Sequence, residues 1–146
     1  MRLAEGCPVA VVSARAVGET YSHSRPHSYW AKKGLSEELS AFYAWLGRNF
    51  VAARAEDYLA AGEWFEARTG RPSALVADGD AVVAAALAYY LGRDRFASFA
   101  ANNAPKGWAE TVRNPGSGHP HFCDLVYRGL LYYDWTDLIS DRCSSR

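Results

Sequence analysis

Two stretches of this chain repeat apolar residues at helical spacing, and both end in the same tripeptide. The first ends at Leu46-Gly47-Arg48 and the second at Leu91-Gly92-Arg93. Spacings of three and four residues place such side chains on one face of a helix, and no segment alternates convincingly with the period of two that marks a half-buried strand. The sequence therefore predicts an all-α bundle of six to eight helices, folded as one domain over residues 1–146. The apolar positions are Leu39, Phe42, Tyr43, Leu46 and Phe50, then Val82, Val83, Ala86, Leu87, Tyr90 and Leu91.

Start and stop signals set the boundaries of the first helices. Ser36 is a suitable N-cap for a helix over 36–50, which either continues or kinks through 52–61. A further segment, 63–68, ends at Thr69-Gly70-Arg71-Pro72, which is a stop signal. These signals predict two or three helices before the second set of helically spaced apolar residues, 82–91.

The rest of the chain is divided by turn-forming residues. Asp78 or Asp80 suits the cap of the helix that carries the second stripe, and Phe96, Phe99 and Ala100 extend that stripe. A short helix is expected over 108–112, and the last helix is expected to begin near His121. Pro, Gly and Ser indicate loops over 22–34 and 114–120, and a turn over 102–107, whereas residues 8–21 fit either a strand or a helix.

Charge and cysteine usage exclude several classes of protein. Lys plus Arg and Asp plus Glu both number 16, so the net charge is zero, which argues against a nucleic-acid or anionic-membrane partner. No run approaches the roughly 18 apolar residues of a membrane span, and none resembles a signal peptide. Cys7, Cys123 and Cys143 form no CxxC pair, which favours reduced thiols and a cytoplasmic protein.

The residue types that could carry chemistry are few. His119, His121 and Cys123 form an H-x-H-x-C run, which together with His23 and His27 could assemble a zinc site. The two histidines flank a proline in a Gly-rich loop, so solvated side chains explain them better, and we predict no metal and no cofactor. The Asp78-Gly79-Asp80 run lacks the later ligands of a calcium loop, so a helix cap explains it better.

The two Gly-Arg pairs suggest binding of a partner. A glycine lets another helix approach closely, and the arginine beside it can hold a carboxylate of that helix. An arginine in the last turn of a helix also complements the helix dipole without any partner, so each pair alone has this second interpretation.

Several segments, taken in order, resemble the Bcl-2 family of apoptosis regulators. Leu46-Gly47-Arg48-Asn49-Phe50 followed by Tyr58 is similar to the family's second helix, and Tyr90-Leu91-Gly92-Arg93 is similar to its Asn-Trp-Gly-Arg motif. Trp135 falls near the start of the family's last short helices. A second register places Asn103 to Trp108 on the family's Gly-Gly-Trp turn and ranks lower. The resemblance implies a bundle around a central apolar helix, with a surface groove for the amphipathic BH-3 helix of a pro-apoptotic protein.

The resemblance also implies which residues form that groove and what the chain does. Gly92 would allow close approach and Arg93 would pair with an Asp of the ligand. The chain would be a compact, viral-like inhibitor of apoptosis in the host cytosol, without enzymatic activity. The groove would be formed by Phe50, Tyr58, Val83, Leu87, Gly92, Arg93, Phe96 and Phe99.

Other functions remain open from the sequence. One is a small helical metal-binding protein or enzyme that uses His119, His121 and Cys123. Another is a generic helical inhibitor or immunity-type interaction module. Because an empty apolar groove is an exposed patch, self-association into a homodimer is also compatible with the sequence.

Overall fold

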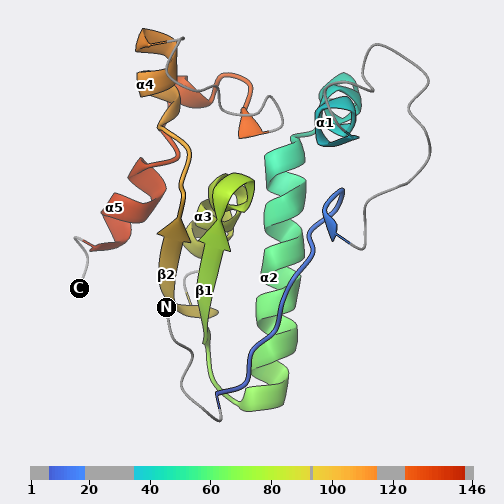
Figure 1. The fold of residues 1–146 in the computed structure, drawn as a ribbon, viewed down its shortest axis with the longest axis vertical. Coiled ribbons are helices and arrows are strands. Elements are labelled where there is room, and N and C mark those ends of the chain that lie inside the picture. Colours follow the sequence, from blue (N-terminus) through green and yellow to red (C-terminus); the bar gives the residue numbers. More distant parts are fainter. Residues whose placement is uncertain (1–6, 19–34, 93, 115–123, 144–146) are drawn as a thin grey trace.

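A β-α-β unit forms the centre of the molecule. The computed structural model describes residues 7–18, 35–92, 94–114 and 124–143 (Figure 1). Strand β1 (Ser73–Asp78) lies parallel to strand β2 (Phe96–Asn102), with Leu75 opposite Phe99 and Ala77 opposite Ala101. Parallel neighbours cannot be joined by a tight hairpin, so the chain crosses over through the 3-10 turn η3 (Gly79–Ala81) and helix α3 (Val82–Leu91).

Helix α3 is buried on nearly all sides. It packs on the two strands, on the long helix α2 (Phe50–Thr69) and on helix α5 (Asp137–Cys143). Its side chains are mostly small, which lets these neighbours approach closely, and the ring of Tyr89 stacks on Phe99 of β2 at 5.4 Å between centroids. The buried positions of α3 are Val82, Val83, Ala84, Ala85, Ala86, Ala88 and Tyr89.

The prediction of an all-α bundle of six to eight helices is wrong. The described residues form five α-helices, two 3-10 turns and a parallel two-stranded sheet, so the fold is mixed α/β. A central apolar helix is present as α3, but it is the crossover between two strands. Phe96–Ala100, expected to extend the helical stripe, forms β2. In β1, exposure does alternate, but Ala74 and Val76 are on the exposed side, so hydrophobicity alone hides the period of two.

The predicted helix over 36–50 is divided in two. Helix α1 (Leu35–Trp45) ends where Gly47 adopts a φ of +67° and the Arg48 N–H donates to the carbonyl of Tyr43 at 2.8 Å. Asn49 then caps α2, because its side-chain oxygen accepts from the Ala52 N–H at 3.0 Å. Helix α2 continues without a kink to the predicted stop, where Gly70 has a φ of +70°.

The C-terminal part is less helical than predicted. Helix α4 (Trp108–Arg113) confirms the short helix expected over 108–112. The expected long last helix is wrong within the described residues, since 124–128 are turns and irregular chain, followed by the 3-10 turn η5 (Gly129–Leu131) and by α5. The predicted loop over 22–34 and nearly all of that over 114–120 lie outside the described residues.

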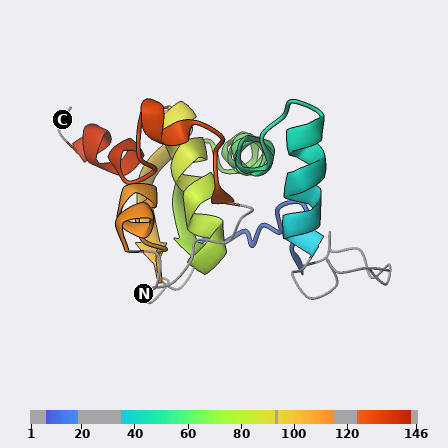
Figure 2. The ribbon, with the colours of Figure 1, turned by 90° about the horizontal axis from the view of Figure 1, so that it is seen from above.

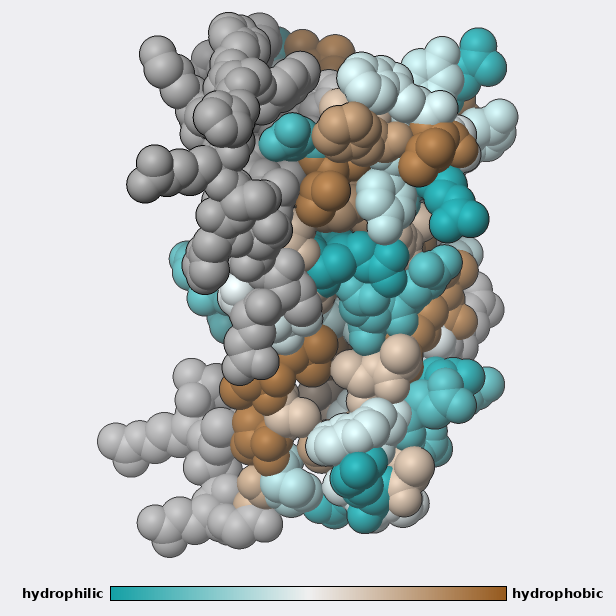
Figure 3. Space-filling model, turned by 90° about the vertical axis from the view of Figure 1, so that its right-hand side faces the viewer, coloured by the Kyte–Doolittle hydropathy of each residue, from teal (hydrophilic) through white to brown (hydrophobic). Residues whose placement is uncertain are grey.

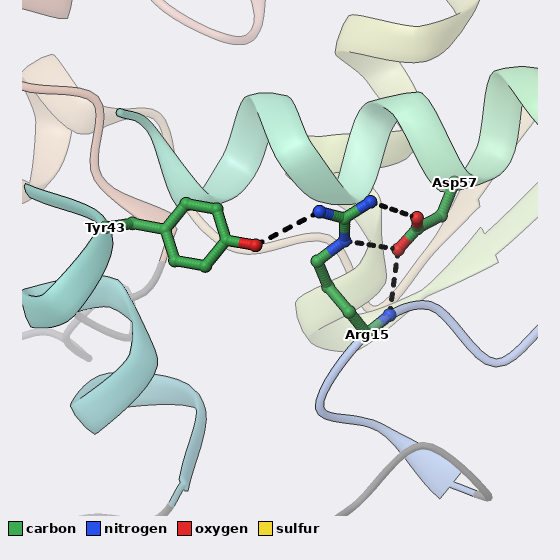
Figure 4. A network of polar contacts seen from close by, with 3 residues as sticks. All are labelled: Arg15, Tyr43 and Asp57. Carbon is green, nitrogen blue, oxygen red and sulfur yellow. Dashed lines mark hydrogen bonds and ion pairs between the residues drawn. The ribbon is translucent and has the colours of Figure 1, made fainter. Parts of the chain in front are cut away.

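The N-terminal segment runs in extended form along α2 over 7–14 and turns beside α1 over 15–18, so its described part forms neither a strand nor an α-helix (Figures 1 and 2). Arg15 fixes it to both helices (Figure 4). Its Nε and backbone N–H donate to Asp57 Oδ2 at 2.8 and 2.9 Å, its Nη2 donates to Asp57 Oδ1, and its Nη1 donates to the Tyr43 hydroxyl at 3.1 Å. These hydrogen bonds hold the pKa of Asp57 below its usual value.

None of the helices in the described ranges combines the length and apolar character that crossing a bilayer requires.

The lowered pKa of Asp57 predicts a pH-dependent stability. A depressed carboxyl pKa contributes stability above the unfolded value, roughly 3.9, which is lost as the pH falls through the folded value. Asp57→Asn should therefore cost about 1 kcal/mol at neutral pH, because the pair is partly exposed and screened, and much less at acidic pH. Urea unfolding at both pH values tests this, with Glu56→Gln as the control on the same helix. A cost that does not change with pH would contradict the assignment.

The close packing of α2 against β2 gives a second prediction. A Cβ at Gly62 would lie 2.8 Å from two ring atoms of Phe96, which is buried. Gly62→Ala should therefore lower stability by about 1–3 kcal/mol, although alanine is favoured over glycine in helix interiors by about 1 kcal/mol. Thermal unfolding measures the change, and the exposed Ala67→Gly on the same helix shows the ordinary effect of propensity. An increase in stability for Gly62→Ala would refute the close contact.

Candidate functional site

Most of the predicted groove residues belong to the core. Phe50, Tyr58, Val83 and Phe96 are buried, and burial raises the pKa of Tyr58. Leu87 and Phe99 are half-buried and pack against the same core. Gly92 lies where a Cβ would come within 2.6 Å of Leu59, so it serves the close approach of α3 to α2. Arg93 lies outside the described residues. The described groove residues therefore lie mostly in the main core, whereas Phe50 belongs to a second, smaller cluster with Ala16 and also lines an open cavity.

That cavity lies between α1 and α4, at the end of the molecule drawn uppermost in Figure 1, and we call it the α1–α4 hollow. Its volume is about 930 Å³. Three parts of the chain line it: the corner from α1 to α2, helix α4, and the segment before and within η5. The lining residues are Ser40, Ala44, Gly47, Arg48, Asn49, Phe50, Trp108, Thr111, Val112, Leu125, Val126, Tyr127, Arg128, Gly129 and Leu130.

The corner from α1 to α2 forms the first wall. The left-handed Gly47 and the cap at Asn49 turn the chain within three residues, so Arg48 lies at the rim and Phe50 at the base. One of the two Gly-Arg pairs singled out in the sequence thus does line an apolar cavity. A Cβ at Gly47 would have no atom within 4 Å, so its role here is the turn.

Asp134 holds α4, which forms the second wall. Its two carboxylate oxygens accept from the backbone N–H groups of Trp108 and Ala109, each at 2.9 Å, and so cap the first turn. Trp135 adds a bond from its indole N–H to the Lys106 carbonyl at 3.2 Å. With its first turn fixed in this way, α4 directs Trp108, Thr111 and Val112 toward the hollow.

The third wall, residues 125–130, is anchored at both ends. Before it, Asp124 forms a buried ion pair with Arg54 of α2, with 3.9 Å between the closest oxygen and nitrogen and both side chains at most 3% exposed. The Arg54 guanidinium also lies over the Phe50 ring, 5.3 Å from its centroid. At the other end Gly129 packs so closely on Trp108 that a Cβ would come within 2.7 Å of the indole ring. The wall is therefore fixed to α2 and to α4.

Arg128, between these anchors, has an unusual backbone. Its φ is +61°, a left-handed conformation that costs a residue with a Cβ roughly 1–2 kcal/mol. Its guanidinium lies 5.6 Å from the ring centroid of Tyr127, whose side chain is exposed. Strain of this kind is common at binding sites.

Two arginines at the hollow have no carboxylate partner in the part of the chain that the structure describes. Neither Arg48 nor Arg128 forms an ion pair with any residue in the described ranges, whereas Lys106 pairs with Glu110 at 2.7 Å and Arg95 with Glu63 at 2.6 Å. The cavity thus combines apolar walls with two cations that form no ion pair within the described ranges. Apolar side chains also gather on the outer surface at the level of α1, as Figure 3 shows.

The residues proposed for metal chemistry are not tested by these observations. His23, His27, His119, His121 and Cys123 lie outside the described residues. Within the described ranges, no three His, Cys, Asp or Glu side chains gather closely enough to hold a metal ion. Asp78 precedes the η3 turn and accepts from the Asn103 side-chain amide at 2.9 Å, although it makes no side-chain cap bond.

Sequence reasoning missed most of the lining. Trp108 and Val112 lie in the short helix expected over 108–112, to which the sequence gives no role. Leu125 and Leu130 lie in the expected last helix, which does not form over the described residues 124–133. The only local signal was Gly47-Arg48. No known protein family, curated protein or solved structure matches this chain.

The buried ion pair predicts how the third wall can be released. Asp124→Asn leaves the Arg54 guanidinium buried without its counter-charge, which should cost about 3 kcal/mol. Urea unfolding measures the loss, and hydrogen exchange should be accelerated over 125–131. Glu63→Gln, which removes an exposed pair, is the control and should change stability by under about 0.5 kcal/mol. A loss as small as the control's would show that the pair does not hold the wall.

Proposed function

We propose that this chain is a binding module, without catalytic activity, that receives an amphipathic helix carrying a carboxylate in the α1–α4 hollow. The observation that carries the proposal is an apolar cavity whose rim holds two arginines, Arg48 and Arg128, without an ion-pair partner among the described residues. A partner with apolar anchors and one acidic side chain would complement both features.

The dimensions of the hollow support a helix as the ligand. Its volume of about 930 Å³ lies near the upper end of the roughly 300–1,000 Å³ typical of ligand pockets. Helices that bind in grooves bury apolar anchors at i, i+3, i+4 and i+7 and leave polar residues at the rim. Phe50, Trp108 and Leu125 would contact such anchors, and Arg48 or Arg128 would bind the carboxylate.

BH-3 helices belong to this class of ligand, so inhibition of apoptosis by sequestering them stays a prediction. The proposal keeps the binding of a helix from the Bcl-2 resemblance and not the helical bundle, which the fold contradicts. A panel of BH-3 peptides tests that narrower function. If none binds while other acidic amphipathic helices do, the hollow is a binding site without a role in apoptosis.

Two probes test the hollow itself. Anilinonaphthalene sulfonate, an apolar anionic dye, should bind dilute protein with enhanced fluorescence. A library of helical peptides with one fixed Glu and varied apolar anchors should yield binders that displace the dye. Val112→Asp should weaken the binding of both probes. Val76 is exposed on β1 away from the hollow, so Val76→Asp should not change their binding. A folded protein that binds neither probe would refute the proposed function.

The two rim arginines give a quantitative prediction. Arg48→Gln and Arg128→Gln should each lower the affinity for a selected peptide up to about tenfold, because a charge-assisted hydrogen bond near the surface contributes about 1–1.5 kcal/mol. Calorimetry measures the affinity, and Arg71→Gln, an exposed arginine outside the hollow, is the control. Equal affinity in all three variants would show that the arginines do not contact the carboxylate.

Replacing Arg128 by glycine separates binding from folding. Arg128→Gly should lower the affinity for the peptide as Arg128→Gln does. It should also raise the free energy of unfolding by about 1 kcal/mol, because glycine adopts a positive φ without strain. Arg113→Gly, in the helical conformation of α4, should instead lower stability. If the variant binds the peptide more weakly but is more stable, its loss of affinity cannot be attributed to unfolding.

A further inference from the structure

Helix α1 has two apolar faces, and the described residues cover one of them. Leu39 and Tyr43 pack against Phe50 of α2 and Ala16 of the N-terminal segment. On the outer face, Phe42, Trp45 and Leu46 are 46%, 77% and 74% exposed. The rings of Phe42 and Trp45 lie edge to face with centroids 5.3 Å apart, so this face is an ordered apolar surface. Amphipathic surface helices cover one such face and leave the other polar, so this exposed face indicates a missing contact.

The outer face of α1 also carries a carboxylate. Glu38, Phe42 and Trp45 follow i, i+4 and i+7, so they lie on one side of the helix. Glu38 forms no ion pair with any described residue. Helix α1 is therefore itself an amphipathic helix with apolar anchors and an acidic side chain, the kind of ligand that the hollow fits.

We propose that α1 of a second copy of this chain occupies the α1–α4 hollow, and that two copies exchange this contact reciprocally. The proposal rests on the proposed function, because it requires the hollow to accept an acidic amphipathic helix. Trp45 and Phe42 of one copy enter the hollow of the other, and Glu38 pairs with Arg48 or Arg128 there. Ser40 and Ala44 line the hollow from the opposite side of α1, so one helix forms a wall of its own hollow and fills its neighbour's.

Symmetry and area favour a closed pair. When each copy offers both a hollow and a helix, reciprocal exchange gives a two-fold dimer and leaves no free site for further growth. Each helix-in-hollow contact is used twice, so the dimer buries twice the area of a single contact. Charge complementarity is also used twice, since Glu38 and the two rim arginines of each copy have no ion-pair partner among the described residues.

The dimer would regulate the binding site. A partner helix and α1 of the second copy compete for the same hollow, so binding of the partner separates the dimer. The affinity of the chain for a partner should then fall as its own concentration rises, because the hollow of each copy becomes covered.

Sedimentation velocity over a range of concentrations tests the exchange. The wild-type chain should form dimers, and Trp45→Glu should weaken the dimer at least tenfold, because a carboxylate replaces the main anchor. Trp64→Glu is the matched control, since Trp64 is also an exposed tryptophan but lies on α2 outside the hollow. A wild-type chain that stays monomeric, or a dimer that Trp45→Glu leaves intact, would overturn the proposal.

Charge reversal tests the pairing. Glu38→Arg should weaken the dimer, and adding Arg48→Glu or Arg128→Glu to that variant should restore it by at least fivefold if the second residue is the partner of Glu38. Failure of both combinations to restore the dimer would overturn the assigned ion pair.

Two probes distinguish this inference from the proposed function. A labelled peptide of residues 35–46 should bind the Trp45→Glu variant, and the dye signal per chain should fall with concentration for the wild type only. If dye and library peptides bind while the 35–46 peptide does not and the chain is monomeric, the exchange is wrong and the proposed function stands. If no probe binds even the Trp45→Glu variant, the proposed function fails as well.

Discussion

The burial of helix α3 is the constraint on which the rest of the structure depends. Two parallel strands need a crossover, and a crossover helix that packs on a sheet, on α2 and on α5 must be apolar around its whole circumference. Its neighbours also have to come close, which is why its buried positions are mostly alanine. Glycines supply the remaining space, at Gly62 facing Phe96 and at Gly92 facing Leu59. A core built from small residues leaves little tolerance for added volume.

Helix α2 connects this core to the α1–α4 hollow. Its middle is fixed against α3, and its first turns reach beyond the β-α-β unit, where Phe50 forms the base of the hollow and Arg54 anchors Asp124. A buried ion pair contributes little net stability compared with an apolar contact, but it is sensitive to the position of both groups. The Arg54–Asp124 pair fixes the position of the irregular segment 125–130, which packing of Leu125 and Val126 alone would not determine.

The sequence predicted the local elements that carry strong end signals and failed where long-range pairing decides the structure. Gly70, Trp108 and the stripe of α3 were placed correctly, because caps and helical periodicity are local properties. The strands were missed because each is short and alanine-rich, and because Phe96 follows α3 at a spacing that continues its stripe. The residues of the candidate site divide in the same way between those with a local signal and those placed by long-range contacts. Gly47-Arg48 was singled out in the sequence and does line the hollow, whereas the other walls come together through long-range contacts, among them the bonds of Asp134 to α4 and the Arg54–Asp124 pair.

The proposed function uses the part of the chain that its core constrains least. Tyr43 links α1 to Arg15 and packs its ring on Phe50, and few other groups hold this helix to the main body. An element attached in this way costs little to move, so it suits a surface that must accept a partner. Its outer face retains Trp45 in water, which is unfavourable for an isolated monomer. The features that weaken α1 as part of the fold are an exposed apolar face and a Glu38 without an ion-pair partner in the described ranges. The same features are those that a helix needs in order to bind in a hollow.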